Sequence, residues 1–268
     1  MSEVIWKPYG DYLTKSNIKR FMDKHNIKTY EELVKRSTSD VEWFWDACLK
    51  DLAFEWYQPY KKVMDNSKGF PWTKWFIGGK INIAHNCLDR HIRDKKGDKL
   101  CLIWEGDDGA IRKLTYKDIY EKSNQVANAL KDIGIKKGDT IGIYMPMIPE
   151  IVIAMFGCFK IGAAVIPIFS RFGSMAVGTR LEDAEAKVLF TADGGMRRGK
   201  NTLTKTEADK ALEMVPSIKK VVVFPRLGVE VPMKKGRDVF WDDFVKGKST
   251  KFETEKLDGY LVAREINL

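Results

Sequence analysis

The chain has 268 residues, of which 44% are hydrophobic and 31% are charged, so it can bury a core as one large or two small domains. Its net charge of +9 would suit a nucleic-acid partner, but lysines alternate with acidic residues and no zinc-finger, RRM or helix-turn-helix signature occurs. No window approaches the ~20 apolar residues of a membrane-spanning helix and the N-terminal segment lacks a signal-peptide layout, so we expect a cytoplasmic protein without nucleic-acid or membrane partners.

The first 40 residues are polar and predict two short helices. One is expected at 18–25 and the other at 29–35, where the Thr29 hydroxyl can cap the helix ahead of Glu31 and Glu32. Residues 1–98 as a whole are predicted to form a helical and irregular N-terminal region.

An aromatic segment follows. Residues 41–60 carry tryptophans and phenylalanine at helical spacing, which predicts an amphipathic helix ended by Pro59, with its aromatic stripe in the core. Gly and Pro interrupt the next stretch, and apolar residues on one face predict a further helix over 82–91.

The cysteines and histidines form no metal-binding or disulfide pattern. His85 and Cys87 lie close together in the sequence but have no second pair of ligands, and no H-E-x-x-H spacing occurs. The four cysteines, which lie far apart without a C-x-x-C pair, are Cys48, Cys87, Cys101 and Cys158. We predict no metal ligands.

From residue 99 the chain alternates between strands and helices at short period. This pattern predicts an α/β fold with a doubly wound, mostly parallel sheet flanked by helices, preceded by the helical, aromatic-rich extension. The expected strands are 100–104, 140–145, 164–169, 188–190 and 219–224, and the expected helices are 116–133, 149–161, 174–184 and 203–215. The α/β unit is predicted to span 99–258 and to be followed by a divergent tail, 259–268.

A basic loop follows the 188–190 strand and is the most informative stretch of the sequence. Asp193, Gly194 and Gly195 are expected to break the strand and free the backbone to turn. Ligands of open α/β sheets bind at the carboxyl ends of strands, and guanidinium forks match phosphate oxygens. The cations that follow the glycines, and that predict a phosphate-binding loop, are Arg197, Arg198 and Lys200.

Two other interpretations of this loop remain open. Residues 194–200 match the first seven positions of a G-x-x-x-x-G-K-[ST] phosphate loop, but Asn201 replaces the hydroxyl residue that binds magnesium. A P-loop NTPase is therefore an alternative. A solvated basic loop without a ligand is the other.

Taken in order, the motifs of the chain resemble the AMP-forming acetyl-CoA synthetases of the acyl-adenylate-forming ligase family. The resemblance runs from about residue 41 to about residue 258. The segments that carry it are WFIGGKINIAHNCLDRH (75–91), IWEGD (103–107), TYKDIYEKSNQVANALKDIGIKKGD (115–139), IYMPMIPE (143–150), 155–163, and AKVLFTADGGMRRGK (186–200).

The resemblance implies a partial coenzyme A site. In this family the basic loop, at the positions of Arg197 and Lys200, contacts the phosphorylated nucleotide end of coenzyme A, and the aromatic residue at the position of Phe169 lies against its adenine. Two glycines that follow this aromatic residue in the family are Ser170 and Arg171 here, so the backbone approach differs. No catalytic residue and no metal ligand is assigned in this chain.

The family's Ser/Thr/Gly-rich ATP loop does not occur in these 268 residues. We therefore expect an N-terminal fragment of an AMP-forming short-chain acyl-CoA synthetase that is catalytically incomplete by itself. ATP and Mg²⁺ would act only in the complete enzyme, together with a small carboxylate and coenzyme A. A non-catalytic module that binds coenzyme A or another nucleotide, and one subunit of a split ligase with a separately encoded C-terminal half, are the alternatives.

Overall fold

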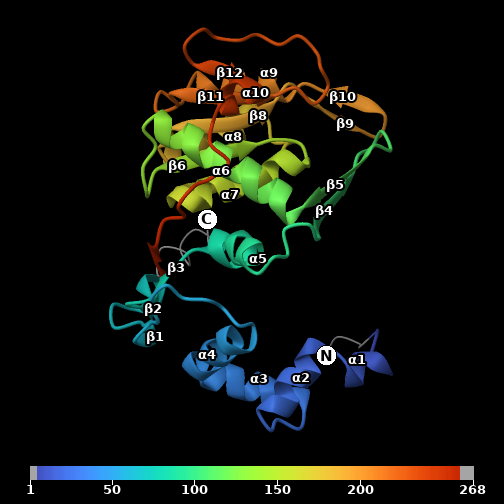
Figure 1. Cartoon of the computed structure of the whole chain (residues 1–268), viewed down its shortest axis with the longest axis vertical. Coiled ribbons are helices and arrows are strands. Elements are labelled where there is room, and N and C mark those ends of the chain that lie inside the picture. Colours follow the sequence, from blue (N-terminus) through green and yellow to red (C-terminus); the bar gives the residue numbers. More distant parts are fainter. Residues whose placement is uncertain (1–4, 260–268) are drawn as a thin grey trace.

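A parallel sheet of five strands forms the centre of the structure, a computed structural model that describes residues 5–259 (Figure 1). The strand order is β12-β11-β8-β6-β7, and every neighbouring pair is parallel. The strands are β6 (Thr140–Tyr144), β7 (Ala164–Pro167), β8 (Val188–Ala192), β11 (Lys220–Phe224) and β12 (Asp238–Phe240). The predicted α/β fold with a parallel sheet is confirmed.

The central strands are apolar on both faces because both faces are covered by helices. In β11, Val222 points into the core on one face, whereas Val221 and Val223 point into the core on the other face. Strand β8 alternates in the same way, with Phe190 on the first face and Leu189 on the second.

Helices cover the two faces in the doubly wound arrangement. The first core contains side chains of α6 (Tyr116–Asp132), α7 (Pro149–Ile161) and α10 (Trp241–Val245). The second core contains side chains of α8 (Ser174–Asp183) and α9 (Thr204–Leu212). Signals in the sequence set the ends of these helices: Thr115 and Asp118 form a capping box at the start of α6, and Gly162 ends α7 in the left-handed conformation at φ 72°.

Two antiparallel hairpins lie beside each other at one edge of this α/β body, which we define as residues 100–245 (Figure 1). One consists of β4 (Leu100–Glu105) and β5 (Ile111–Thr115), and the other of β9 (Gly195–Arg197) and β10 (Lys200–Thr202). They meet where the backbone N–H of Arg198 donates to the Asp107 carboxylate at 2.8 Å.

The N-terminal arm, residues 5–51, lies at the far end of the molecule from the sheet (Figure 1). Its helices are α1 (Asp11–Thr14), α2 (Asn17–Lys24), α3 (Tyr30–Ser39) and α4 (Val41–Asp51). The two short helices predicted at 18–25 and 29–35 are confirmed as α2 and α3, and Thr29 caps α3 by accepting the Glu32 N–H.

The helix predicted over 41–60 is wrong beyond Asp51. Ala53 adopts φ +50°, and its carbonyl accepts a hydrogen bond from Arg90 at 2.8 Å, so the chain leaves the helix to meet a distant segment. The aromatic stripe is also less buried than predicted: Trp43 and Phe44 are half-buried, and Trp45 is exposed.

Short elements connect the arm to the body. They are β1 (Lys62–Asp65), η1 (Phe70–Trp72), β2 (Lys74–Ile77), β3 (Lys80–Ile81), the π-helical turn η2 (His85–Asp89) and α5 (Arg90–Arg93). The helix predicted over 82–91 is found from residue 83 to 93. Strand β13 (Leu257–Asp258) returns from the body and pairs with β3. The domain boundaries at residues 98 and 258 stay a prediction, and residues 260–268 of the expected tail lie outside the described part.

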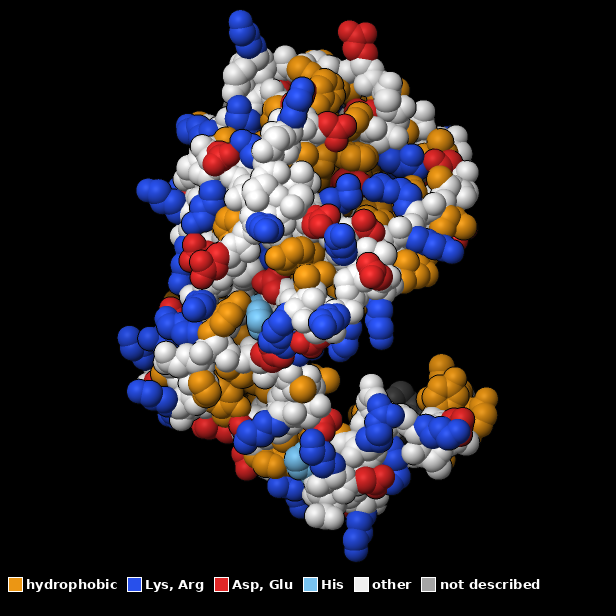
Figure 2. All heavy atoms as spheres, viewed as in Figure 1, with side chains coloured by type: hydrophobic (Ala, Val, Ile, Leu, Met, Phe, Trp, Pro, Cys, Tyr) orange, Lys and Arg blue, Asp and Glu red, His pale blue; other side chains and the backbone are white. Residues whose placement is uncertain are grey.

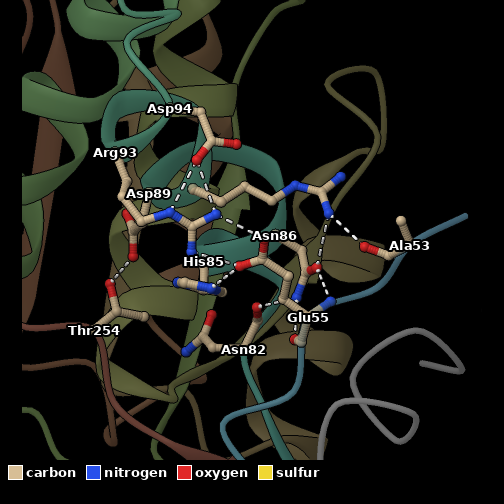
Figure 3. A network of polar contacts seen from close by, with 10 residues as sticks. Ala53, Glu55, Asn82, His85, Asn86, Asp89, Arg93, Asp94 and Thr254 are labelled. Atoms are coloured by element: carbon tan, nitrogen blue, oxygen red, sulfur yellow. Dashed lines mark hydrogen bonds and ion pairs between the residues drawn. The ribbon is translucent and has the colours of Figure 1, made fainter.

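A polar network holds the segment after α4 against the helical turn η2–α5 (Figure 3). The Glu55 carboxylate accepts two hydrogen bonds from Arg93, at 2.8 and 2.9 Å, and lies 2.9 Å from Nε2 of His85. The hydrogen bonds from Arg93 lower the pKa of Glu55 to about 2. The Asn86 side chain accepts the Glu55 N–H and donates to the Glu55 carbonyl.

No helix within residues 5–259 combines the length and the apolar composition needed to cross a membrane. Side chains of both charges are interleaved over the visible face of the body, as the sequence predicted (Figure 2).

Candidate functional site

The loops at the carboxyl ends of β6, β7 and β8 line a cavity of about 300 Å³. Pro146 and Met147 follow β6, Phe169 and Arg171 follow β7, and Arg197 lies in the hairpin that follows β8. Loops of three neighbouring strands therefore contribute to the wall of the cavity, together with the β4–β5 hairpin and the loop after β11. The sequence predicted a ligand site at this edge of the sheet.

The cavity lies at the topological switch point of the sheet. From β6 the chain passes through α7 to β7 on one side, and from β8 it passes through α9 to β11 on the other side. Helices α7 and α9 lie on opposite faces, so the two connections diverge and leave a crevice between them. Ligands of open α/β sheets bind in such a crevice.

The basic loop is a β-hairpin. Arg197 and Lys200 are paired across the two strands, and Arg198 and Gly199 form the turn with φ +49° and +72°. A phosphate loop of the P-loop kind leads directly into a helix, whereas this segment leads into β10, so the P-loop interpretation is wrong. Arg197 lines the cavity; Lys200 stands opposite it in the hairpin, outside the cavity lining.

Strand β8 ends at Ala192, so the predicted break of the strand at Asp193 is confirmed, but Gly194 and Gly195 do not form the turn. The turn itself is at residues 198–199, and neither glycine has a positive φ. A Cβ on Gly195 would lie 2.8 Å from Cβ of Pro146, and a Cβ on Gly194 would lie 2.4 Å from the Thr202 carbonyl oxygen. Gly195 therefore lets the hairpin pack tightly against the loop after β6, and Gly194 lets its own backbone lie close to β10.

Asp193 holds the site together and was not predicted to do so. Its carboxylate is fully buried and accepts backbone N–H groups of Gly194, Arg226, Leu227 and Val229 at 2.6–3.2 Å. It thus ties the loop after β11 to the end of β8. The three donor groups in that loop lie more than 30 residues away in the sequence, and no local pattern signals them.

The loop after β11 delivers Arg226 to the cavity wall. Its guanidinium donates to Asp108 at 2.7 Å and lies over the Trp104 ring, 5.1 Å from the centroid. The hydrogen bond from Arg226 lowers the pKa of Asp108. The Trp104 indole N–H donates to the Met147 carbonyl at 2.6 Å, which fixes the β4–β5 hairpin to the loop after β6.

Phe169 presents a largely free aromatic ring to the cavity. The side chain is 58% exposed and makes an edge contact with Phe172, with centroids 5.7 Å apart. Strand β7 ends at Pro167, two residues before Phe169, so the ring stands on a loop. The structure thus brings together two of the three residues predicted to bind coenzyme A, Phe169 and Arg197, at one cavity.

This arrangement suits binding of a phosphorylated nucleotide. Within residues 5–259 the Arg197 guanidinium and the Lys200 ammonium have no hydrogen-bond or ion-pair partner, and both are exposed. Unpaired cations match phosphate oxygens, and an exposed ring offers a face to a base. The described residues contain no group of three or more His, Cys, Asp or Glu side chains that could hold a metal ion.

Two family models match adjoining parts of the chain. The model described as AMP-binding enzyme matches residues 88–254, and the model described as acetyl-coenzyme A synthetase N-terminus matches residues 30–87. Among curated proteins, the acetyl-coenzyme A synthetase of Methanothrix soehngenii is 42% identical over 95% of this chain and 38% of its own length. The acetyl-coenzyme A synthetase of Alkalilimnicola ehrlichii is 39% identical over 96% of this chain and 39% of its own length.

A solved structure supports the fold. The acetoacetyl-CoA synthetase from Streptomyces lividans superposes with a TM-score of 0.83 at 22% identity, covering 96% of this chain and 40% of that chain. The chain thus spans about two fifths of the length of the proteins it matches.

Proposed function

The chain belongs to the family of AMP-binding enzymes, and we propose that it forms the N-terminal portion of an AMP-forming acetyl-CoA synthetase. Such an enzyme joins a carboxylate to coenzyme A through an acyl-adenylate made from ATP. The observation that carries the proposal is the adjoining pair of family matches, which run from residue 30 to residue 254 without a gap. Acetate is the carboxylate we propose, because the curated relatives above are named for it.

Within that enzyme, we propose that this chain supplies part of the coenzyme A site. Arg197 and Lys200 would hold phosphate groups of coenzyme A, and Phe169 would lie against its adenine. Two features support this assignment: Arg197 and Phe169 line one cavity, and Lys200 is paired with Arg197 in a hairpin whose cations are unpartnered within residues 5–259. Coenzyme A supplies the thiol that accepts the acyl group.

The test is calorimetric titration of coenzyme A into the 268-residue chain. We expect saturable binding that Arg197→Ala with Lys200→Ala weakens at least tenfold, because a hydrogen bond to a charged group contributes ~1.5–3 kcal/mol. The control is Arg20→Ala with Lys219→Ala, which removes the same charge from exposed positions outside the cavity. Equal losses in the two double variants would show that net charge, and not this hairpin, attracts the ligand.

Two further expectations complete the proposal. We expect the isolated chain to be catalytically incomplete, so that acetate-dependent exchange of pyrophosphate into ATP by the purified chain would contradict it. A separately encoded C-terminal half is the proposed partner if the chain acts as one subunit. Detection of the native polypeptide with an antibody separates the cases: a band more than twice the mass of 268 residues contradicts a split enzyme.

A further inference from the structure

Arg171 is a second unpartnered cation at the cavity, and it lies on a different loop from the basic hairpin. It follows β7, whereas Arg197 follows β8. Its guanidinium is exposed and has no hydrogen-bond or ion-pair partner within residues 5–259.

Arg171 also lies where two cavities meet. Besides the cavity of about 300 Å³, it lines an adjoining one of about 280 Å³. The two cavities share four lining residues, which are Ser170, Arg171, Thr202 and Thr204. A ligand in the first cavity can therefore extend past Arg171 into the second.

The order of the strands separates the two cations. Strands β7 and β8 lie on either side of β6, and neighbouring strands are ~4.8 Å apart, so the loops that carry Arg171 and Arg197 begin about 10 Å apart. Each long side chain can reach toward the space between them. Two cations at this separation can each bind one of two phosphate groups of the same ligand.

The charges around the cavity leave these two guanidinium groups available. Three arginines and two acidic residues line it, but the third arginine, Arg226, is paired with Asp108. Asp107 already accepts the Arg198 N–H, which leaves Glu105 as the carboxylate without a partner within residues 5–259. Glu105 belongs to the β4–β5 hairpin, so the acidic wall and the two free cations arise from different elements.

We propose that Arg171 is a second phosphate-binding cation of this cavity, and that together with Arg197 it selects nucleotides that carry phosphate groups at two positions. The proposal rests on the nucleotide site of the proposed function and adds a residue and a specificity to it. Each guanidinium offers a planar fork of donors to one phosphate group, so a ligand with a single phosphate group can satisfy only one of them.

The experiment compares adenosine 3′,5′-bisphosphate with 3′-AMP and 5′-AMP by calorimetry at constant ionic strength. The readout is the ratio of the affinity for the bisphosphate to the affinity for the tighter monophosphate. We expect a ratio of roughly ten or more in the unaltered chain, since each charge-assisted contact contributes about this factor. In Arg171→Gln and in Arg197→Gln the ratio should fall to about one.

Arg180→Gln is the matched control. Arg180 is exposed on α8, donates to the Ala176 carbonyl, and lies over the Phe172 ring at 4.6 Å, outside both cavity linings. This variant removes one positive charge nearby and should keep the ratio of the unaltered chain. Because the side chain of Arg171 has no partner, Arg171→Gln should fold with an unchanged unfolding midpoint.

The outcomes separate this proposal from the one it rests on. If the unaltered chain binds none of the three nucleotides, the nucleotide site itself is refuted, and Arg171 with it. If it binds them with a ratio of ten that Arg171→Gln leaves unchanged, the site stands and the role of Arg171 is refuted. If Arg180→Gln lowers the ratio as far as Arg171→Gln, the preference comes from general charge and the proposal also fails.

Discussion

The α/β body buries far more apolar side chains than the N-terminal arm, in which several large ones are exposed. The body buries residues on both faces of its sheet: every residue of β8 is buried, and so are the three central residues of β11. The arm has a small core of Phe21, Met22, Ile27, Leu33 and Ala47. Other apolar side chains of the arm, and of the segment just after it, stay exposed, including Trp6 at 57% and Leu52 at 62%.

This difference shows what specifies each region. In the body, the apolar pattern, the helix caps and the turn residues all favour the same structure, so local sequence and tertiary packing agree. In the arm, contacts with other segments determine where a helix ends. The polar network around Glu55, which follows α4, is an example. The hydrophobic side chains gathered at the N-terminal end of the arm are visible in Figure 2.

The largest effect is expected from removing an aromatic side chain in the body. Phe190→Ala should lower the free energy of unfolding by about 3–5 kcal/mol, because Phe190 is fully buried against Trp241 and Phe244. The equivalent Phe44→Ala in the arm should lower the free energy of unfolding by about half as much or less, because Phe44 is only half-buried and therefore loses less buried apolar surface. Urea unfolding followed by circular dichroism measures both, and equal losses would contradict the contrast between the two regions.

Asp193→Ala should come next. It leaves four backbone N–H groups, one buried and three partly buried, without their acceptor. An unsatisfied buried donor costs ~1–3 kcal/mol and water can reach the partly buried ones, so we expect a loss of about 3 kcal/mol. Asp193→Asn keeps one acceptor oxygen and should lose less. Asp183→Ala, at the exposed end of α8, is the control and should change stability by no more than about 0.5 kcal/mol. A similar small change in Asp193→Ala would show that the loop after β11 holds without it.

Much of the body could be predicted from the sequence because its signals are local. Pro149 at the first turn predicted the start of α7, and the apolar run 219–224 predicted β11. Strand β12 and helix α10 were missed. Three residues, Asp238–Phe240, carry too little pattern to predict a strand, and they become one by pairing with β11.

The site was predictable only where its signals are local in the sequence. Its place at a strand end and the cations of the hairpin followed from residues close in sequence, whereas the assignment of Phe169 came from resemblance. Asp193 and Arg226 were missed because their partners lie far away in the chain. The P-loop match misled because seven residues of pattern do not determine whether a helix or a strand follows.

The polar network around Glu55, which lies between the arm and the body, should stabilise the protein less at acid pH. The pKa of Glu55 is about 2 in the folded chain and near 4.5 when unfolded, so its stabilising contribution is present above about pH 4.5 and is lost as the pH falls toward 2. Glu55→Gln should remove this contribution, which we expect to be about 1 kcal/mol or less because Glu55 and Arg93 are both partly exposed.

The measurement is the unfolding free energy of each protein between pH 5 and pH 2. The curves of the unaltered chain and Glu55→Gln should converge as the pH falls. Glu182→Gln, an exposed carboxylate of α8 without a partner in the described residues, should run parallel to the unaltered chain. A constant gap between Glu55→Gln and the unaltered chain down to pH 2 would show that the charge of Glu55 does not stabilise the junction.

Similarly small effects are expected from removing helix caps, and these test the contrast between body and arm most directly. Thr115 caps α6 in the body and Thr29 caps α3 in the arm, each accepting the backbone N–H three residues on at 3.1 Å. Loss of such a cap costs ~1 kcal/mol of helix stability. Thr115→Ala should therefore lower the global free energy of unfolding by about 1 kcal/mol, because α6 packs in the main core and unfolds with it.

Thr29→Ala should act locally instead. The first turn of α3 should exchange its amide hydrogens several-fold faster, while the global unfolding free energy changes by less than about 0.5 kcal/mol, because few buried contacts couple α3 to the body. Hydrogen exchange and urea unfolding of Thr115→Ala and Thr29→Ala distinguish a global from a local effect. Thr29→Ser should restore the slow exchange. A global loss in Thr29→Ala as large as that in Thr115→Ala would mean that arm and body unfold as one cooperative unit.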